Sequence, residues 1–165
     1  MSFWSLNPKV FYWKCLRCGE CCRHLTSKRF GMPLLPEEAW RLQHLAKRLG
    51  VTVNIKPLAS DGFRVTLYQM ADEVCPFLSG NRCMIYEQRP IACRAYPLRA
   101  SGVARCEAVE RMRRMYFGKN VPINFPPWLK YWGKVYSRTI FPRLQSALML
   151  CDLNGRWRLK RGNLI

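Results

Sequence analysis

Acidic residues and histidines are scarce in this chain of 165 residues. Ten Asp and Glu stand against 28 Lys and Arg, and only two histidines are present, His24 and His44. Paired carboxylates for acid–base catalysis are therefore few. We expect both histidines at the surface, although His24 follows a cysteine group and could serve as a ligand. The sequence has no glycine-rich phosphate loop and no dinucleotide-binding fingerprint, so nucleotide chemistry has no support.

Long apolar runs are also lacking, and the stretch at residues 146–151 is far too short to span a bilayer. The first residues do not follow a basic segment with an apolar one, so they do not read as a secretory signal. We therefore expect a cytoplasmic location. Apolar residues make up 49% of the chain, which excludes a disordered protein, and the length favours a single domain.

The scarcity of acidic residues leaves a formal net charge of +18. Such an imbalance repels itself in a compact fold, and a polyanionic partner would relieve the repulsion. RNA or a ribonucleoprotein is the first expectation, since a sequence pI of about 10.1 is typical of nucleic-acid binders. An anionic membrane surface ranks second.

Nine cysteines are the main feature of the sequence. Disulfides rarely form in a reducing compartment, and an odd number cannot pair fully within one chain, so metal binding is the better explanation. The first group has the spacing C-x2-C-x2-C-C, and Gly19 permits the tight turn with which two thiolates bind one metal ion. The same spacing suits an iron–sulfur cluster. This group comprises Cys15, Cys18, Cys21 and Cys22.

Four more cysteines follow in a stretch rich in proline and glycine: Cys75, Cys83, Cys93 and Cys106. Eight thiols suit two four-thiolate sites, or one cluster surrounded by structural thiols. We expect zinc or a [4Fe-4S] cluster, in one or two sites. Because adjacent side chains point apart, Cys21 and Cys22 are expected to differ in role. The ninth cysteine, Cys151, lies in an apolar context and is expected to bind no metal.

The chain resembles the CxxCxxCC cysteine-cluster family of zinc- or iron-chelating proteins over about residues 15–97. The matching segments are the first cysteine group, the residues from Cys75 to Leu78, and the run from Cys83 through Arg89-Pro90 and Cys93-Arg94 to Pro97. The resemblance implies metal or iron–sulfur binding. The cysteine-cluster domain of flagellin lysine methylase is a distant relative, which implies methyl transfer only weakly.

The expected fold is mostly α, with a small α+β fold as the alternative, and with irregular cysteine-bearing loops. Apolar spacing predicts helices over residues 36–49, 101–117 and 128–140, a short helix over residues 143–150, and one strand over residues 63–68. We expect residues 1–117 to form a metal-binding domain with a basic helix. Residues 118–165 would form a helical extension and a basic tail packed on the same domain.

Basic clusters in the last third are the candidate RNA contacts, because cations neutralise phosphates and an aromatic ring stacks on an unpaired base. The sequence therefore favours a basic metal-binding protein, without catalytic residues, that docks on structured RNA such as the ribosome. The alternative is an iron–sulfur enzyme or redox protein linked to methyl transfer. The candidate contacts are Arg111, Arg113, Arg114, Arg156, Trp157, Arg158, Lys160 and Arg161.

Overall fold

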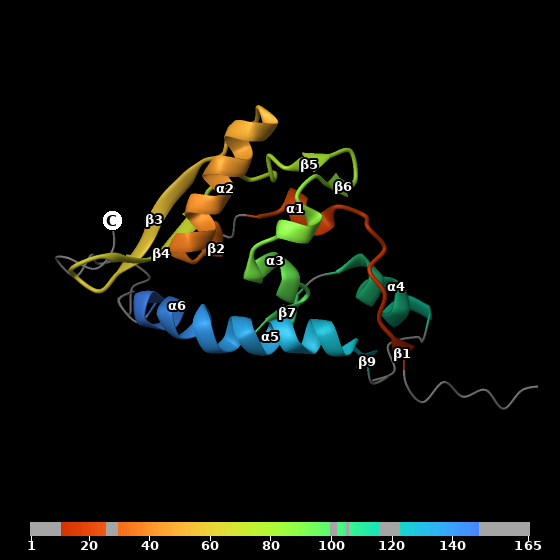
Figure 1. Ribbon diagram of the computed structural model, residues 1–165. Coiled ribbons are helices and arrows are strands. Elements are labelled where there is room, and N and C mark those ends of the chain that lie inside the picture. Colours follow the sequence, from red (N-terminus) through yellow and green to blue (C-terminus); the bar gives the residue numbers. More distant parts are fainter. Residues whose placement is uncertain (1–10, 26–29, 100–101, 105, 116–122, 149–165) are drawn as a thin grey trace, which may run out of the picture.

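A computed structural model describes residues 11–25, 30–99, 102–104, 106–115 and 123–148. These residues form an α+β fold, with a three-stranded antiparallel sheet at one end and a set of helices and cysteine-bearing loops at the other (Figure 1). The prediction of a mostly α fold was wrong. The four predicted helices came close to expectation, but most of the strands and the short helices at residues 20–23, 86–88 and 91–95 were not predicted.

The sheet has the order β2-β4-β3, and helix α2 packs against β4. Helix α2 spans Pro36–Leu49, as predicted. Proline occupies its first turn, and Gly50 ends it with a φ of 67°, a left-handed conformation that glycine adopts without strain. The strands are β2 (Met32–Leu34), β3 (Ile55–Ser60) and β4 (Val65–Met70).

Strand β3 was missed in the sequence, and the strand predicted at residues 63–68 lies two residues later, as β4. Pro57 interrupts the β3 pattern, because proline cannot donate a ladder hydrogen bond. Since β3 is an edge strand with register shifts after Pro57, the missing donor is tolerated there. The hairpin tip between the two strands exposes Phe63 completely.

Three two-stranded pairs connect segments that are distant in the sequence or close a tight loop. Parallel pairing of β1 with β9 brings the segment before Cys15 onto the chain that follows α4. The other two pairs are short hairpins, and one of them ends at Cys83. The pairs are β1 (Phe11–Tyr12) with β9 (Ile123–Asn124), β5 (Leu78–Ser79) with β6 (Arg82–Cys83), and β7 (Leu98–Arg99) with β8 (Gly102–Val103).

Among the remaining helices, those after residue 106 lie close to where apolar spacing placed them, whereas the short ones at residues 20–23, 86–88 and 91–95 fall in the cysteine-bearing stretches that were expected to be irregular. Helix α5 packs on α3 and β7, and α6 packs on α5 and on β3 and β4 (Figure 1). The helix expected over residues 101–117 begins only at Glu107, because residues 102 and 103 pair as β8. The last helix, α6, begins two residues before the predicted start, with Pro142 in its first turn. The elements are α1 (Glu20–Arg23), the 3-10 turn η1 (Tyr86–Gln88), α3 (Ile91–Ala95), α4 (Glu107–Met115), α5 (Pro127–Thr139) and α6 (Phe141–Leu148).

Buried side chains gather in three clusters, and two of them contain cysteines. The first, which we call the sheet cluster, lies between α2 and the cysteine loops and includes Cys22 and Cys75, with Cys83 and Cys93 packed against it. A second joins α6 to β3 and β4. The third, which we call the Trp13 cluster, packs Trp13 and Cys106 with residues of α4, β9 and α5.

In the part of the chain that the structure describes, no helix has both the length and the apolarity needed to cross a membrane.

Candidate metal centre

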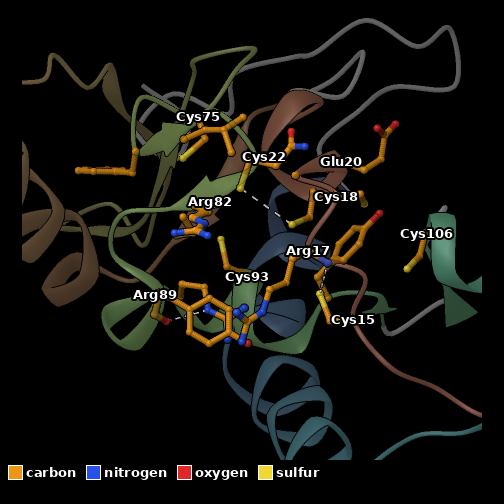
Figure 2. Close-up of a pocket in the computed structure, with 18 of the residues that line it drawn as sticks. Cys15, Arg17, Cys18, Glu20, Cys22, Cys75, Arg82, Arg89, Cys93 and Cys106 are labelled. Atoms are coloured by element: carbon orange, nitrogen blue, oxygen red, sulfur yellow. Dashed lines mark hydrogen bonds between the residues drawn. The ribbon is translucent and has the colours of Figure 1, made fainter.

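All eight predicted ligand cysteines line one cavity of about 360 Å³. Each of the eight is a free thiol. Figure 2 shows the labelled side chains of this cavity, which come from the loop before α1, from α1 itself, from the segment between β4 and β5, from β6, from the residue after η1, from α3 and from the residue before α4. The eight are Cys15, Cys18, Cys21, Cys22, Cys75, Cys83, Cys93 and Cys106.

The first cysteine group makes a tight turn before α1. Arg17 has a φ of 52°, and its backbone N–H donates to the Cys15 sulfur at 3.4 Å. Gly19 follows with a φ of 75°, and its carbonyl accepts from the Cys22 N–H at 2.9 Å. Because a left-handed backbone at this point favours glycine, Gly19 reverses the chain as the sequence predicted. Two thiols of the group are thereby brought to the cavity before the helix starts.

Arg23 attaches this group to the β5–β6 hairpin. Its guanidinium donates to the Cys18 carbonyl at 2.7 Å, to the Gly80 carbonyl at 3.2 Å and to the Asn81 side-chain oxygen at 2.6 Å. The guanidinium carries donors on separate nitrogens, so Nη1 reaches the Cys18 carbonyl while Nη2 reaches the hairpin, a span that the single nitrogen of a lysine does not cover. The hairpin that carries Cys83 is therefore held against the first cysteine group.

Two further cysteines are placed by backbone contacts. The Cys75 N–H donates to the Cys22 carbonyl at 2.7 Å, so these two residues meet directly although 53 positions separate them (75 − 22). Cys83 pairs with Leu78 across the hairpin, and the Ile85 N–H donates to the Cys83 thiol.

Cys93 lies on α3, whose position depends on a buried carboxylate. Glu38 is 3% exposed and accepts from the Leu35 N–H at 2.9 Å and from the Ile91 N–H at 2.7 Å. Its two oxygens therefore join the start of α2 to the start of α3. The Cys93 thiol itself donates to the Met32 sulfur at 3.0 Å.

Cys106 precedes α4 and belongs to the Trp13 cluster. Trp13 also lines the cavity, is 7% exposed, and packs against Phe125 and Trp128. Its Nε1 is buried and has no hydrogen-bond partner among the described residues. Because buried N–H groups are nearly always paired, this one indicates an acceptor that the described residues do not supply.

Burial and mutual contact raise the pKa of five of these thiols and so favour their protonated form. Burial raises the pKa of Cys15, Cys83 and Cys93. The hydrogen bond between the Cys21 and Cys22 thiols raises the pKa of Cys21, and burial adds to this effect. The hydrogen bond with Cys21 lowers the pKa of Cys22. The hydrogen bond with Cys75 and burial raise it by more, so the pKa of Cys22 is raised to about 12.

Comparison of the sequence with known protein families agrees with a metal site built from these cysteines. The model of the CxxCxxCC family, described as "Putative zinc- or iron-chelating domain", matches residues 14–111. The chain belongs to this family. Comparison with curated proteins and with solved structures gives no significant match.

The CxxCxxCC match extends from just before Cys15 to just beyond Cys106, so it contains all eight cavity cysteines and excludes Cys151. It confirms the resemblance seen at the cysteine motifs and supports a chelated metal. It says nothing of RNA or of a ribosome.

The chemistry of the cavity fits a thiolate-bound metal. Thiolates are ligands of zinc, and they also hold iron–sulfur clusters. Three arginines line the cavity, and none of them forms an ion pair with a described carboxylate: Arg17, Arg82 and Arg89. The positive charge of Arg89 acts on Cys21, Cys83 and Cys93 and lowers their pKa against the effect of burial.

The thiols surround the cavity without already converging on a point. Among the described side chains, no three Cys, His, Asp or Glu stand close enough together to hold one metal ion. The sulfurs of Cys21 and Cys22 lie 3.9 Å apart. Metal binding therefore requires side-chain rotation within the cavity.

The two histidines and the RNA candidates lie elsewhere or have other partners. His24 is exposed and contacts Glu20, and His44 stacks on Trp40 at the surface of α2. Arg111 and Arg114 both bind the carboxylate of Glu107, at 3.0 and 2.8 Å.

Arg113 falls within α4. The tail candidates Arg156, Trp157, Arg158, Lys160 and Arg161, and also Cys151, lie outside the described residues.

Sequence reasoning missed the residues that position the ligands. In the sequence Arg23 is the residue that ends the first cysteine motif, and Glu38 is part of an acidic helix start, and neither was given a positioning role. Trp13 read as part of an aromatic segment. The signal that could have singled out Glu38 is its place three residues after the helix cap, where a glutamate reaches back to the cap N–H.

Proposed function

We propose that this chain is a metal-binding protein whose cavity thiolates hold zinc or an iron–sulfur cluster. The observation that carries the proposal is that eight free thiols from separate segments line a single cavity. In a folded protein without disulfides, such a concentration of thiols has a ready use as a ligand set. A bound metal would join the loop before α1, the β5–β6 hairpin, α3 and the start of α4.

The protonated thiols make metal binding a proton-releasing reaction. A thiol must lose its proton before it can ligate, so each Cys–metal bond replaces an S–H bond. Burial makes a free thiolate costly in this cavity, and the metal charge would compensate for that cost. Arg89 would offset part of the negative charge that remains when four thiolates surround a divalent ion.

The metal would act first as a structural element. Structural zinc sites contribute folding free energy, on the order of 10 kcal/mol in small zinc domains. An iron–sulfur cluster would supply electron-transfer chemistry in addition, and would support the alternative of a redox or methyl-transfer enzyme.

Reconstitution separates these possibilities. The chain is purified without oxygen, stripped of metal, and supplied with zinc or with iron and sulfide. Recovered resistance to limited proteolysis with one of the two identifies the resident metal. The variant Cys75→Ser is expected to lose this recovery, and Cys151→Ser serves as the matched control. If stripping leaves proteolysis unchanged and neither metal binds, the proposal fails.

RNA docking is a second candidate, favoured by the net charge of +18. On α4 two arginines share one carboxylate, so Arg111 and Arg114 together keep a surplus positive charge at an exposed surface. Lys130 and Lys134 add exposed cations along α5. Phosphate contacts of this kind do not depend on RNA sequence.

Salt dependence tests the RNA candidate. Each phosphate contact releases condensed counterions, so affinity for a structured RNA should fall steeply with salt. Replacing Arg156, Arg158, Lys160 and Arg161 by alanine should lower both the affinity and the salt slope, with metal content unchanged. Binding that is absent at moderate salt would remove RNA from the account.

A further inference from the structure

The exposed side of α5 carries cations and aromatic rings, and the helix contains no acidic residue. Five exposed side chains lie on one side of it, because positions three or four apart share a face of a helix. In Figure 1 α5 runs along one edge of the molecule, and it packs on α3 and β7. We call this surface the α5 face, and its residues are Trp128, Lys130, Tyr131, Lys134 and Arg138.

The positive charge of the α5 face is not compensated by the described residues. Lys130, Lys134 and Arg138 follow one another at intervals of four, the spacing at which like charges repel along a helix. None of the three forms an ion pair with a described carboxylate. Residues 111–151 contain eight Lys and Arg and no Asp or Glu, so the neighbouring sequence supplies no opposite charge. A polyanionic partner would relieve the repulsion.

Two aromatic rings stand among these cations. Trp128 is 45% exposed and Tyr131 is 60% exposed. The Tyr131 ring meets that of Trp132 nearly at right angles, with 5.2 Å between the centroids, and the guanidinium of Arg94 lies 4.7 Å from the centroid of Trp132. A ring that its neighbours already hold in place loses little freedom when a planar ligand stacks on it.

Strand β1 extends the same surface beyond the start of α5. Tyr12 is 72% exposed and pairs with Asn124 of β9, whose side-chain oxygen accepts from the Lys130 Nζ at 3.1 Å. The next residue, Trp13, packs on Trp128 with 6.1 Å between the ring centroids. A third exposed ring therefore adjoins the cations at the start of α5.

We propose that the α5 face, together with Tyr12, binds unpaired nucleotides of an RNA, with phosphates on its cations and bases stacked on its rings. This inference rests on the RNA candidate above, and it names the surface and the kind of RNA. Stacking on aromatic side chains needs bases that are not enclosed in a duplex. A membrane fits less well, because an interfacial helix buries its apolar side in lipid, and the apolar side of α5 is already packed on α3 and β7.

Fluorescence anisotropy of the full chain, purified without oxygen, tests the proposal with a labelled single-stranded RNA that has no self-complementarity. The strand should bind at least tenfold more tightly than the duplex formed with its complement. Lys134→Gln with Arg138→Gln should lower the slope of log affinity against log salt by about 1.4, since each phosphate contact on a single strand contributes about 0.7. Lys47→Gln with Arg48→Gln is the matched control, because it removes the same charge from exposed positions of α2 and should leave the slope unchanged.

The aromatic contribution is tested separately. Tyr131→Ala should weaken binding of the single strand about tenfold, whereas Tyr131→Phe keeps the ring and should bind as the wild type does. Phe63→Ala is the matched control, since Phe63 is a fully exposed ring at the tip of the β3–β4 hairpin, and it should not change the affinity. Metal content, measured in the same samples, should be equal in all variants.

Three results would overturn the proposal, and they differ in what else they affect. Wild-type affinity and salt slope in the α5 variants would remove the face and leave RNA binding to other cations. Equal affinity for strand and duplex would remove the preference for unpaired nucleotides. Binding to vesicles of phosphatidylcholine and phosphatidylserine, with none to RNA, would assign the surface to a membrane and reject the RNA candidate as well. The proposed metal site stands or falls on the metal content alone.

Discussion

Replacing Glu38 tests how the fold positions Cys93. Its carboxylate accepts two backbone N–H groups, one at the start of each of two helices. A hydrogen bond to a charged group contributes about 1.5–3 kcal/mol, so losing two amounts to about 3–6 kcal/mol. Relief of the cost of burying a charge, which is visible in the raised pKa of Glu38, offsets part of this sum. We expect Glu38→Ala to lower the free energy of unfolding by about 3 kcal/mol.

The assay is urea unfolding of the metal-loaded chain, followed by circular dichroism. Glu37→Ala is the matched control, because it removes the same charge one position earlier at an exposed site. It should change stability by less than about 0.5 kcal/mol. Glu38→Gln keeps one acceptor oxygen and should lose roughly half as much as the alanine variant. If Glu38→Ala and Glu37→Ala unfold at the same urea concentration, the carboxylate does not join α2 to α3.

Other consequences follow from the remaining contacts. A lysine at position 23 has one donor nitrogen in place of two, so it would not reach the Cys18 carbonyl and the β5–β6 hairpin together. Arg23→Lys should therefore weaken metal affinity at least tenfold in a chelator competition. Unchanged affinity would show that Arg23 does not hold the hairpin against the first cysteine group. Arg89→Gln removes a positive charge that acts on three thiols, and it should weaken metal binding more at low salt than at high salt. The pKa of Cys22 is raised to about 12, so below that pH zinc must displace a proton from this thiol in order to bind it. Zinc affinity should therefore rise steadily between pH 6 and 8 in a competition titration. A flat profile would argue against thiolate ligation. Cys151→Ala should leave the metal stoichiometry unchanged, and loss of a whole site would overturn its exclusion.

The chemistry of the centre was more predictable than its surroundings. Ligand spacing in the sequence identified eight cysteines, and these eight line one cavity. The spacing of ligands along the chain is a local property, so it can be recognised in the sequence without knowledge of the fold. Where each cysteine lies around the cavity depends on which hydrophobic cluster it joins. It also depends on contacts such as that of Cys75 with Cys22, across 53 positions (75 − 22). Periodicity along the chain contains no such information.

The fold shows the same limit. Helices α2 and α5 followed from apolar spacing and end signals, because these are local. The sheet did not, since β2 is three residues long and β3 contains Pro57, and neither carries a complete alternating pattern. Their pairing with β4 supplies the stability that their own sequences lack, and it joins positions as distant as Met32 and Met70.

The metal content of the intact chain tests the central claim most directly. Native mass spectrometry of protein purified without oxygen should find zinc or iron bound at one or more ions per chain. The quadruple variant with serine at Cys22, Cys75, Cys83 and Cys93 should lose bound metal. A wild-type chain that is folded and metal-free, with every cavity thiol open to a thiol reagent before and after metal is added, would contradict the account.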